Sequence, residues 1–260
     1  MNKKNILISL SLGALLVLGG GEGYAAQAAS PSSSSYMNSL ARAMKSGKQT
    51  PTYSLDFDAS KYSTREMTYQ GQTVKFRAYE NMVYTAHPAD VSSESMSIYI
   101  PEAYFTKGGT VNGYTAKTAP IFMPNGVGGY MPGTICAPSE NDKMSGGANA
   151  SLGALAHGYV VAAPAIRGRT TKNSDGVYVG KAPALIVDYK AAVRYLRHNR
   201  NKLPAGDTEK IISNGTSAGG ALSALLGATG NAVEYEPYLR AIGAAEERDD
   251  IFASMDYCPI

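Results

Sequence analysis

Ser217 is the residue of this chain whose surroundings best suit chemistry. It stands at the centre of Gly215-Thr216-Ser217-Ala218-Gly219, a G-x-S-x-G pattern between an apolar run and an Ala- and Leu-rich stretch. Glycines beside such a serine permit the sharp, strained strand-to-helix turn that projects a nucleophilic hydroxyl. The pattern alone is common, so the strand before it and the helix after it are what make it informative. We therefore expect Ser217 to be a nucleophile. The alternative is a glycine-rich turn with a capping serine.

A hydroxyl that attacks a carbonyl also needs donors for the oxygen that becomes negatively charged. The expected helix begins just after Ser217, so its dipole and the Ala218 N–H face that oxygen. An earlier glycine-rich stretch, residues 125–129, follows another apolar run, and glycines let backbone N–H groups turn inward there. We expect this loop to complete an oxyanion hole with Ala218. Taken alone, the loop suits a flexible surface turn equally well.

The base and the orienting acid that a serine nucleophile requires are not found after it. His87, His157 and His198 all precede Ser217, whereas hydrolases with this elbow place the acid and then the histidine after the serine. Each histidine has an ordinary place, either in a turn or at a helix end. Among the acidic residues after Ser217, only Asp256 falls in an expected strand.

The elements that must position these residues alternate between strand and helix. Apolar or alternating runs predict strands over 67–70, 73–79, 95–100, 120–123, 159–163, 210–214 and 251–258. Apolar residues at helical spacing predict helices over 152–156, 185–196 and 218–227. This alternation favours a mostly parallel sheet with helices on both faces, and the elbow makes it an α/β-hydrolase fold. Because the acid and base are missing, we expect the fold to be C-terminally truncated.

The first residues resemble a targeting segment rather than part of the fold. Lys3 and Lys4 precede the apolar run 6–18, and small residues follow up to Ala26-Gln27-Ala28, which fits an A-x-A cleavage site. Gly23-Tyr24-Ala25 is a second option for the cleavage site. We therefore expect a secretory signal peptide over 1–28, a Ser-rich linker over 29–50 and the N-terminal part of a hydrolase domain over 51–260. The protein is expected to be secreted or periplasmic, with no membrane segment after signal removal.

Composition narrows the possible partners and cofactors. The chain has 260 residues, a formal charge of +3, 17% charged residues and 44% hydrophobic residues, which excludes a disordered chain and gives no case for nucleic acid. Residues 126–129 lack the dinucleotide-binding spacing, and neither a P-loop nor H-E-x-x-H occurs, so no cofactor or metal is expected. Cys136 and Cys258 can pair in an oxidising compartment or stay unpaired. The oligomeric state is not predicted.

Charged residues cluster after the strand expected at 159–163. We interpret Arg167 and Arg169, which follow that strand in an Arg-Gly turn, as braces for loops beside the candidate site. Asp188 and Lys190 on the next expected helix are interpreted as a solvated or loop-tethering pair.

These motifs together resemble bacterial tannases, α/β-hydrolases that cleave galloyl esters. The resemblance runs from about Thr52 to the last residue and is most specific in the elbow 214–220 and in 167–170. It implies that Ser217 attacks the ester carbonyl of a small galloyl or hydroxybenzoyl ester and that the Gly129 and Ala218 N–H groups hold the oxyanion. The resemblance also implies that the acid, the histidine and the galloyl-binding groups of the family lie beyond Ile260, and that Asp256 does not correspond to the family's acid.

Two other interpretations stay open. A feruloyl-type esterase or a peptidase of the same fold would share the elbow. Alternatively, the chain is a truncated, non-catalytic remnant or a binding module, because a serine without its base keeps only what the oxyanion hole and binding supply. The complete protein is expected to be the enzyme, and the 260-residue chain alone is expected to be inactive.

Overall fold

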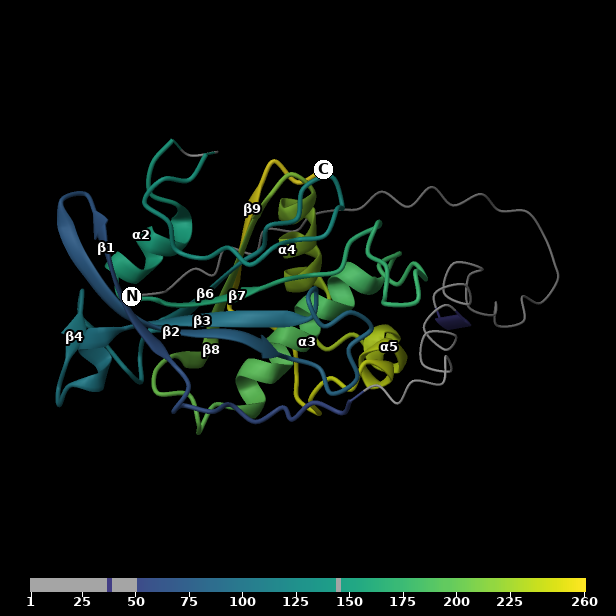
Figure 1. Cartoon of the computed structure of the whole chain (residues 1–260), viewed down its shortest axis with the longest axis horizontal. Coiled ribbons are helices and arrows are strands. Elements are labelled where there is room, and N and C mark those ends of the chain that lie inside the picture. The colour runs from purple at the N-terminus through teal and green to yellow at the C-terminus, as the bar shows by residue number, and fades with distance from the viewer. Residues whose placement is uncertain (1–36, 39–50, 144–145) are drawn as a thin grey trace, which may run out of the picture.

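The computed structural model describes residues 37–38, 51–143 and 146–260 (Figure 1). The expected signal peptide over 1–28 and the linker over 29–50 lie outside the described residues, apart from residues 37 and 38. No helix in the described part of the chain is long and apolar enough to cross a membrane.

A seven-stranded sheet forms the centre of the molecule, in the order β1-β2-β3-β7-β6-β8-β9. Its strands are β1 (Ser63–Tyr69), β2 (Gln72–Val83), β3 (Ser95–Pro101), β6 (Pro120–Pro124), β7 (Val160–Pro164), β8 (Asp207–Thr216) and β9 (Ala253–Tyr257). An antiparallel meander of β1, β2 and β3 joins the four parallel strands β7, β6, β8 and β9. This confirms the predicted α/β fold and its parallel central strands.

Helices cover both faces of the sheet, as predicted. On one face, α3 (Ala184–His198) and α4 (Ala218–Ala228) pack against each other, and α5 (Glu236–Ala241) packs against α3. The other face carries α2 (Ala150–Ala156), which Figure 1 shows apart from α3 and α4. Alternate residues of β7 enter the two cores, Val160 and Ala162 on the α3 side and Val161 on the α2 side, because successive strand side chains point to opposite faces.

The remaining elements are short. Two 3-10 turns cover Glu102–Phe105 and Val233–Tyr235, and a separate two-stranded ribbon pairs β4 (Thr110–Val111) with β5 (Tyr114–Thr115). The predicted hairpin forms around residues 70–71, where Gly71 has a φ of 79°. The helix α2 ends at Ala156 with His157 as its C-cap, and Gly158 then takes the left-handed conformation that favours glycine.

The structure corrects one interpretation of the charged residues. Asp188 and Lys190 are fully buried, so the pair is not solvated. Nearly all of α3 lies within the core, and its charged side chains therefore need buried partners. Arg167 pairs with Asp188, and Lys190 Nζ lies 2.7 Å from Asp249 Oδ1. The alternative interpretation, that these residues tether loops, is the correct one.

Candidate active site

Ser217 forms the whole turn between β8 and α4. The strand ends at Thr216 and the helix begins at Ala218, and between them Ser217 has φ 59° and ψ −124°. Its N–H donates to the Tyr257 carbonyl of β9 at 2.9 Å, and its carbonyl accepts from the Ala221 N–H at 2.9 Å. A serine held at positive φ is strained, and the surrounding hydrogen bonds fix it there. The geometry is that of the predicted elbow.

Three glycines allow this turn because backbone approaches them closely. A Cβ at Gly215 would collide with the Gly219 carbonyl. One at Gly219 would lie 2.5 Å from Asn125 Oδ1, and one at Gly220 would lie 2.5 Å from the Tyr257 carbonyl oxygen. The G-x-S-x-G pattern therefore has a steric cause here as well as a conformational one.

In the described part of the chain, the surroundings of the Ser217 hydroxyl supply hydrogen-bond donors, and no histidine or carboxylate is hydrogen-bonded to it. The first N–H groups of a helix have no acceptor within the helix, and α4 presents its N-terminus, starting at Ala218, at this turn. Within the described residues the Ser217 side chain makes no hydrogen bond, not even as a cap of α4. The arrangement can stabilise negative charge, but activation of the serine needs a group from elsewhere.

The predicted oxyanion loop leaves the end of β6 and turns sharply at residues 128–131. The Met131 N–H donates to the Gly128 carbonyl at 2.9 Å, and both central residues have positive φ, 55° at Gly129 and 58° at Tyr130. The Tyr130 carbonyl accepts from the Arg169 N–H at 2.8 Å, and its hydroxyl donates to the Ile260 carbonyl at 2.7 Å. Gly129 is exposed at the tip of this anchored turn.

Asn125, a residue that sequence reasoning gave no role, joins the loop to the elbow. Its buried Nδ2 lies 3.1 Å from the carbonyl oxygens of Asn214 and Gly219 and from Ser223 Oγ, and its Oδ1 accepts from the Val127 N–H at 3.3 Å. One amide thus fixes the end of β6 against the end of β8 and the first turns of α4. In the sequence, Asn125 stands only as the first residue of the glycine-rich stretch 125–129, and its partners in β8 and α4 lie far along the chain.

The three histidines occupy the ordinary places expected of them. His87 donates its backbone N–H to Ile242, His157 caps α2 with Nδ1 2.7 Å from the Gly153 carbonyl, and His198 Nε2 lies 3.5 Å from Asp56 Oδ1. None of them makes a hydrogen bond to Ser217. Asp256 lies in β9, is exposed, and accepts from Ser254 Oγ at 2.9 Å.

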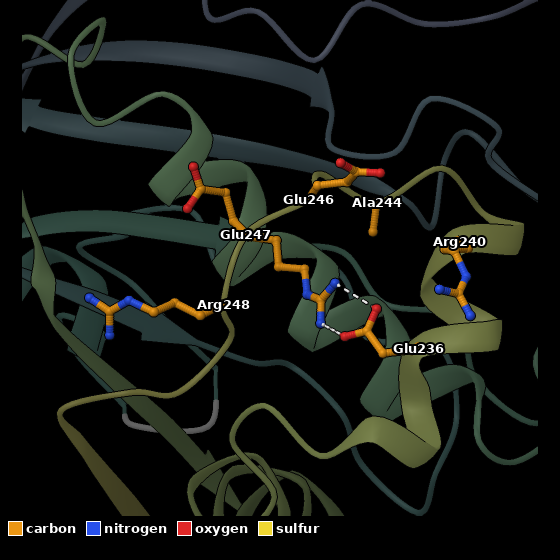
Figure 2. Close-up of a pocket in the computed structure, with 7 residues that line it drawn as sticks. Glu236, Arg240, Ala244, Glu246, Glu247 and Arg248 are labelled. Carbon is orange, nitrogen blue, oxygen red and sulfur yellow. Dashed lines mark hydrogen bonds and ion pairs between the residues drawn. The ribbon is translucent and has the colours of Figure 1, made fainter.

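Several hollows lie on the described surface. An open cleft of about 540 Å³ on the α2 side of the sheet reaches Thr216 and Tyr257. An apolar cavity of about 260 Å³ lies between Tyr130, the start of α3 and α4. Another hollow, of about 480 Å³, is lined mainly by arginine and glutamate side chains around Glu236 (Figure 2).

The described residues hold no group of three or more metal-ligating side chains. Cys136 and Cys258 are both free thiols, so of the two alternatives for these cysteines the structure has the unpaired one. Burial raises the pKa of the Cys136 thiol to about 11, which keeps it protonated and unreactive at neutral pH.

Comparisons with known proteins identify relatives of the chain. The BD-FAE family matches residues 133–254. A tannase structure from Fusobacterium nucleatum is 55% identical with a TM-score of 0.77, and the match covers 80% of this chain and 43% of that one. A tannin acyl hydrolase from Lactobacillus plantarum is 48% identical with a TM-score of 0.72, covering 79% and 44%. No curated protein sequence matches the chain.

Two further matching structures contain small phenolic compounds. Tannin acyl hydrolases in complex with ethyl gallate and with 3,4-dihydroxybenzoate are each 46% identical with a TM-score of 0.73, and each match covers 79% of this chain. The chain spans 44% and 45% of those two proteins, which is less than half of their length.

Proposed function

The chain is a relative of the tannases, and on that basis we propose that the complete protein is an exported serine hydrolase that cleaves galloyl esters through an acyl-enzyme on Ser217. The observation that carries this proposal is the strained turn at Ser217, which brings a hydroxyl without a hydrogen-bond partner in the described residues to the N-terminus of α4.

In the proposed reaction, Ser217 is the nucleophile and backbone N–H groups stabilise the oxyanion. Ser217 Oγ attacks the ester carbonyl carbon while its proton passes to a base, and the carbonyl oxygen becomes an oxyanion held by the Ala218 and Gly129 N–H groups. The alcohol leaves with a proton returned by the base, and water then hydrolyses the acyl-enzyme. We propose that the base, a histidine, and its acid come from the part of the protein beyond Ile260.

The substrate class rests on the relatives. Their complexes with ethyl gallate and 3,4-dihydroxybenzoate support an acyl group that carries an aromatic ring with hydroxyl groups. The secreted or periplasmic location rests on the signal-like residues 1–28 alone.

Ser217→Ala in the complete protein tests the nucleophile. We expect kcat for methyl gallate to fall by roughly 10⁴-fold or more, because removing a catalytic serine removes covalent catalysis. Ser213→Ala is the matched control, since Ser213 lies on β8, the strand that leads to Ser217, and its buried hydroxyl has no hydrogen-bond partner among the described residues, so its loss should leave kcat unchanged. Retained activity in Ser217→Ala would exclude the proposed mechanism.

A substrate panel tests the specificity. Methyl gallate should be hydrolysed faster than methyl ferulate, an acetate ester and a peptide. Faster turnover of ferulate or of the peptide would favour the feruloyl-type esterase or the peptidase, and equal rates on all would refute a tannase.

A further inference from the structure

A cluster of three ionisable side chains lies buried next to the segment that contacts the candidate oxyanion loop. Arg167, Asp188 and Glu94 come from three different parts of the chain, and all are completely inaccessible to solvent. Fully buried charges are costly unless they are paired and hydrogen-bonded. Such a cluster in a protein of this size needs a structural or functional reason, and the proposed reaction does not use it directly.

The Asp188 carboxylate accepts hydrogen bonds from three nitrogen atoms of Arg167. The carboxylate accepts from the Arg167 backbone N–H at 2.8 Å, and its two oxygens accept from Nε at 3.0 and 3.1 Å and from Nη2 at 2.5 Å. Glu94 Oε2 lies 3.5 Å from Nε, and Arg167 Nη1 donates to the Val179 carbonyl at 3.2 Å. Both the backbone and the side chain of Arg167 are therefore fixed to α3 and to the residues before β3.

The residues around Arg167 in turn hold the loop that carries Gly129. Ile166 and Gly133 exchange two backbone hydrogen bonds of 2.9 Å, and the Arg169 N–H donates to the Tyr130 carbonyl at 2.8 Å. Between them, a Cβ at Gly168 would collide with the backbone of Met131 and Pro132. Residues 130–133 are thus held against residues 166–169 by backbone hydrogen bonds and close packing.

We propose that Arg167, clamped by Asp188, is a positioning residue that sets the orientation of the Gly129 N–H in the oxyanion hole. This inference rests on the proposed function, because it deepens the role given to Gly129. An oxyanion hole works only if its donors are already in place when charge develops on the substrate oxygen, which requires a loop that does not move. The exposed tip of the loop obtains that rigidity from the buried cluster through residues 166–169.

Arg167→Lys in the complete protein is the first test. Lysine keeps the charge but lacks the planar fork that bonds Asp188 through two nitrogen atoms. We expect kcat for methyl gallate to fall by roughly 10-fold to 100-fold with little change in KM, since oxyanion donors act mainly in the transition state.

Arg194→Lys is the matched control. Arg194 is also buried, lies on α3 and pairs with two carboxylates, Asp249 and Glu236. Among the described residues, its ion pairs and hydrogen bonds are not made with the loop at residues 125–133. Arg194→Lys should lose stability, as Arg167→Lys does, yet keep kcat. An unchanged kcat in Arg167→Lys, or an equal fall in both variants, would overturn the positioning role.

Asp188→Asn decides the matter if Arg167→Lys does not fold. Asparagine keeps the shape of Asp188 and one acceptor oxygen, but its amide nitrogen is a donor and cannot accept from the Arg167 N–H groups. A folded Asp188→Asn variant should therefore lose kcat for methyl gallate with little change in KM, and an unchanged kcat would overturn the positioning role.

The failure of this inference can be told apart from failure of the proposed function. If Ser217→Ala is inactive but Arg167→Lys keeps its kcat, only the positioning role is wrong. If Ser217→Ala keeps its activity, the proposed function itself is wrong.

Discussion

At the scale of single residues, the elbow depends on glycines, which have no Cβ atom to collide with the neighbouring backbone. Gly215 has no space for a methyl group, because the neighbouring Gly219 carbonyl is backbone and cannot rotate away. Gly215→Ala should therefore lower the free energy of unfolding by roughly 2–3 kcal/mol, as overpacking does, and abolish hydrolysis by displacing Ser217. Gly147→Ala, at a position with open space, is the control for denaturant unfolding. Equal stability of the two variants would contradict the steric argument.

Glu94 gives a second prediction at this scale. Burial raises the pKa of its carboxyl from 4.5 to about 8, so the folded protein holds a proton that the unfolded chain releases. The contribution of the protonated Glu94 carboxyl to the free energy of unfolding is fully present below pH 4.5 and is lost as the pH rises toward 8. Glu94→Gln should therefore unfold with a shallower loss of stability across this range. Parallel curves of unfolding free energy against pH would show that Glu94 ionises normally.

At the scale of elements, the sequence pattern predicted those features whose residues are close together in the chain. The elbow, α3 and the parallel strands each have their signature within a short stretch of sequence. Asn125 and the Glu94–Arg167–Asp188 cluster have no such signature, because their partners lie far away in the sequence. The charges of α3 left open whether Asp188 and Lys190 are solvated or tether loops, because periodicity cannot show that a helix is buried on nearly every side.

Asn125 is the clearest test of how the elements are joined. Asn125→Ala leaves the buried carbonyl of Gly219 and the hydroxyl of Ser223 without their donor, which should cost about 1–3 kcal/mol of unfolding free energy. It should also reduce kcat, because the end of β6 and the start of α4 lose their common anchor. Asn201→Ala, on the exposed surface, serves as the control. Normal kinetics and stability in Asn125→Ala would show that the backbone alone holds the loop.

At the scale of the whole molecule, the sheet is unevenly covered. Its last strand in the described residues, β9, has partner β8 on one side, and exposed apolar side chains cluster there, with Phe252 66% and Tyr257 51% accessible. A strand edge of this kind invites pairing with other chains. The 260-residue chain expressed alone should therefore associate in sedimentation velocity experiments, whereas the complete protein should not. A monomer that unfolds cooperatively would instead favour the remnant or binding-module interpretation.

The strained backbone of Ser217 has a consequence for how such a sequence evolves. Glycine adopts φ 59° without the penalty that serine bears, and the Ser217 hydroxyl makes no bond that stabilises the described structure. Ser217→Gly should therefore melt at a higher temperature than the original protein while being inactive. A laboratory selection for heat resistance alone would discard the candidate nucleophile, and only a selection that also requires turnover would retain it.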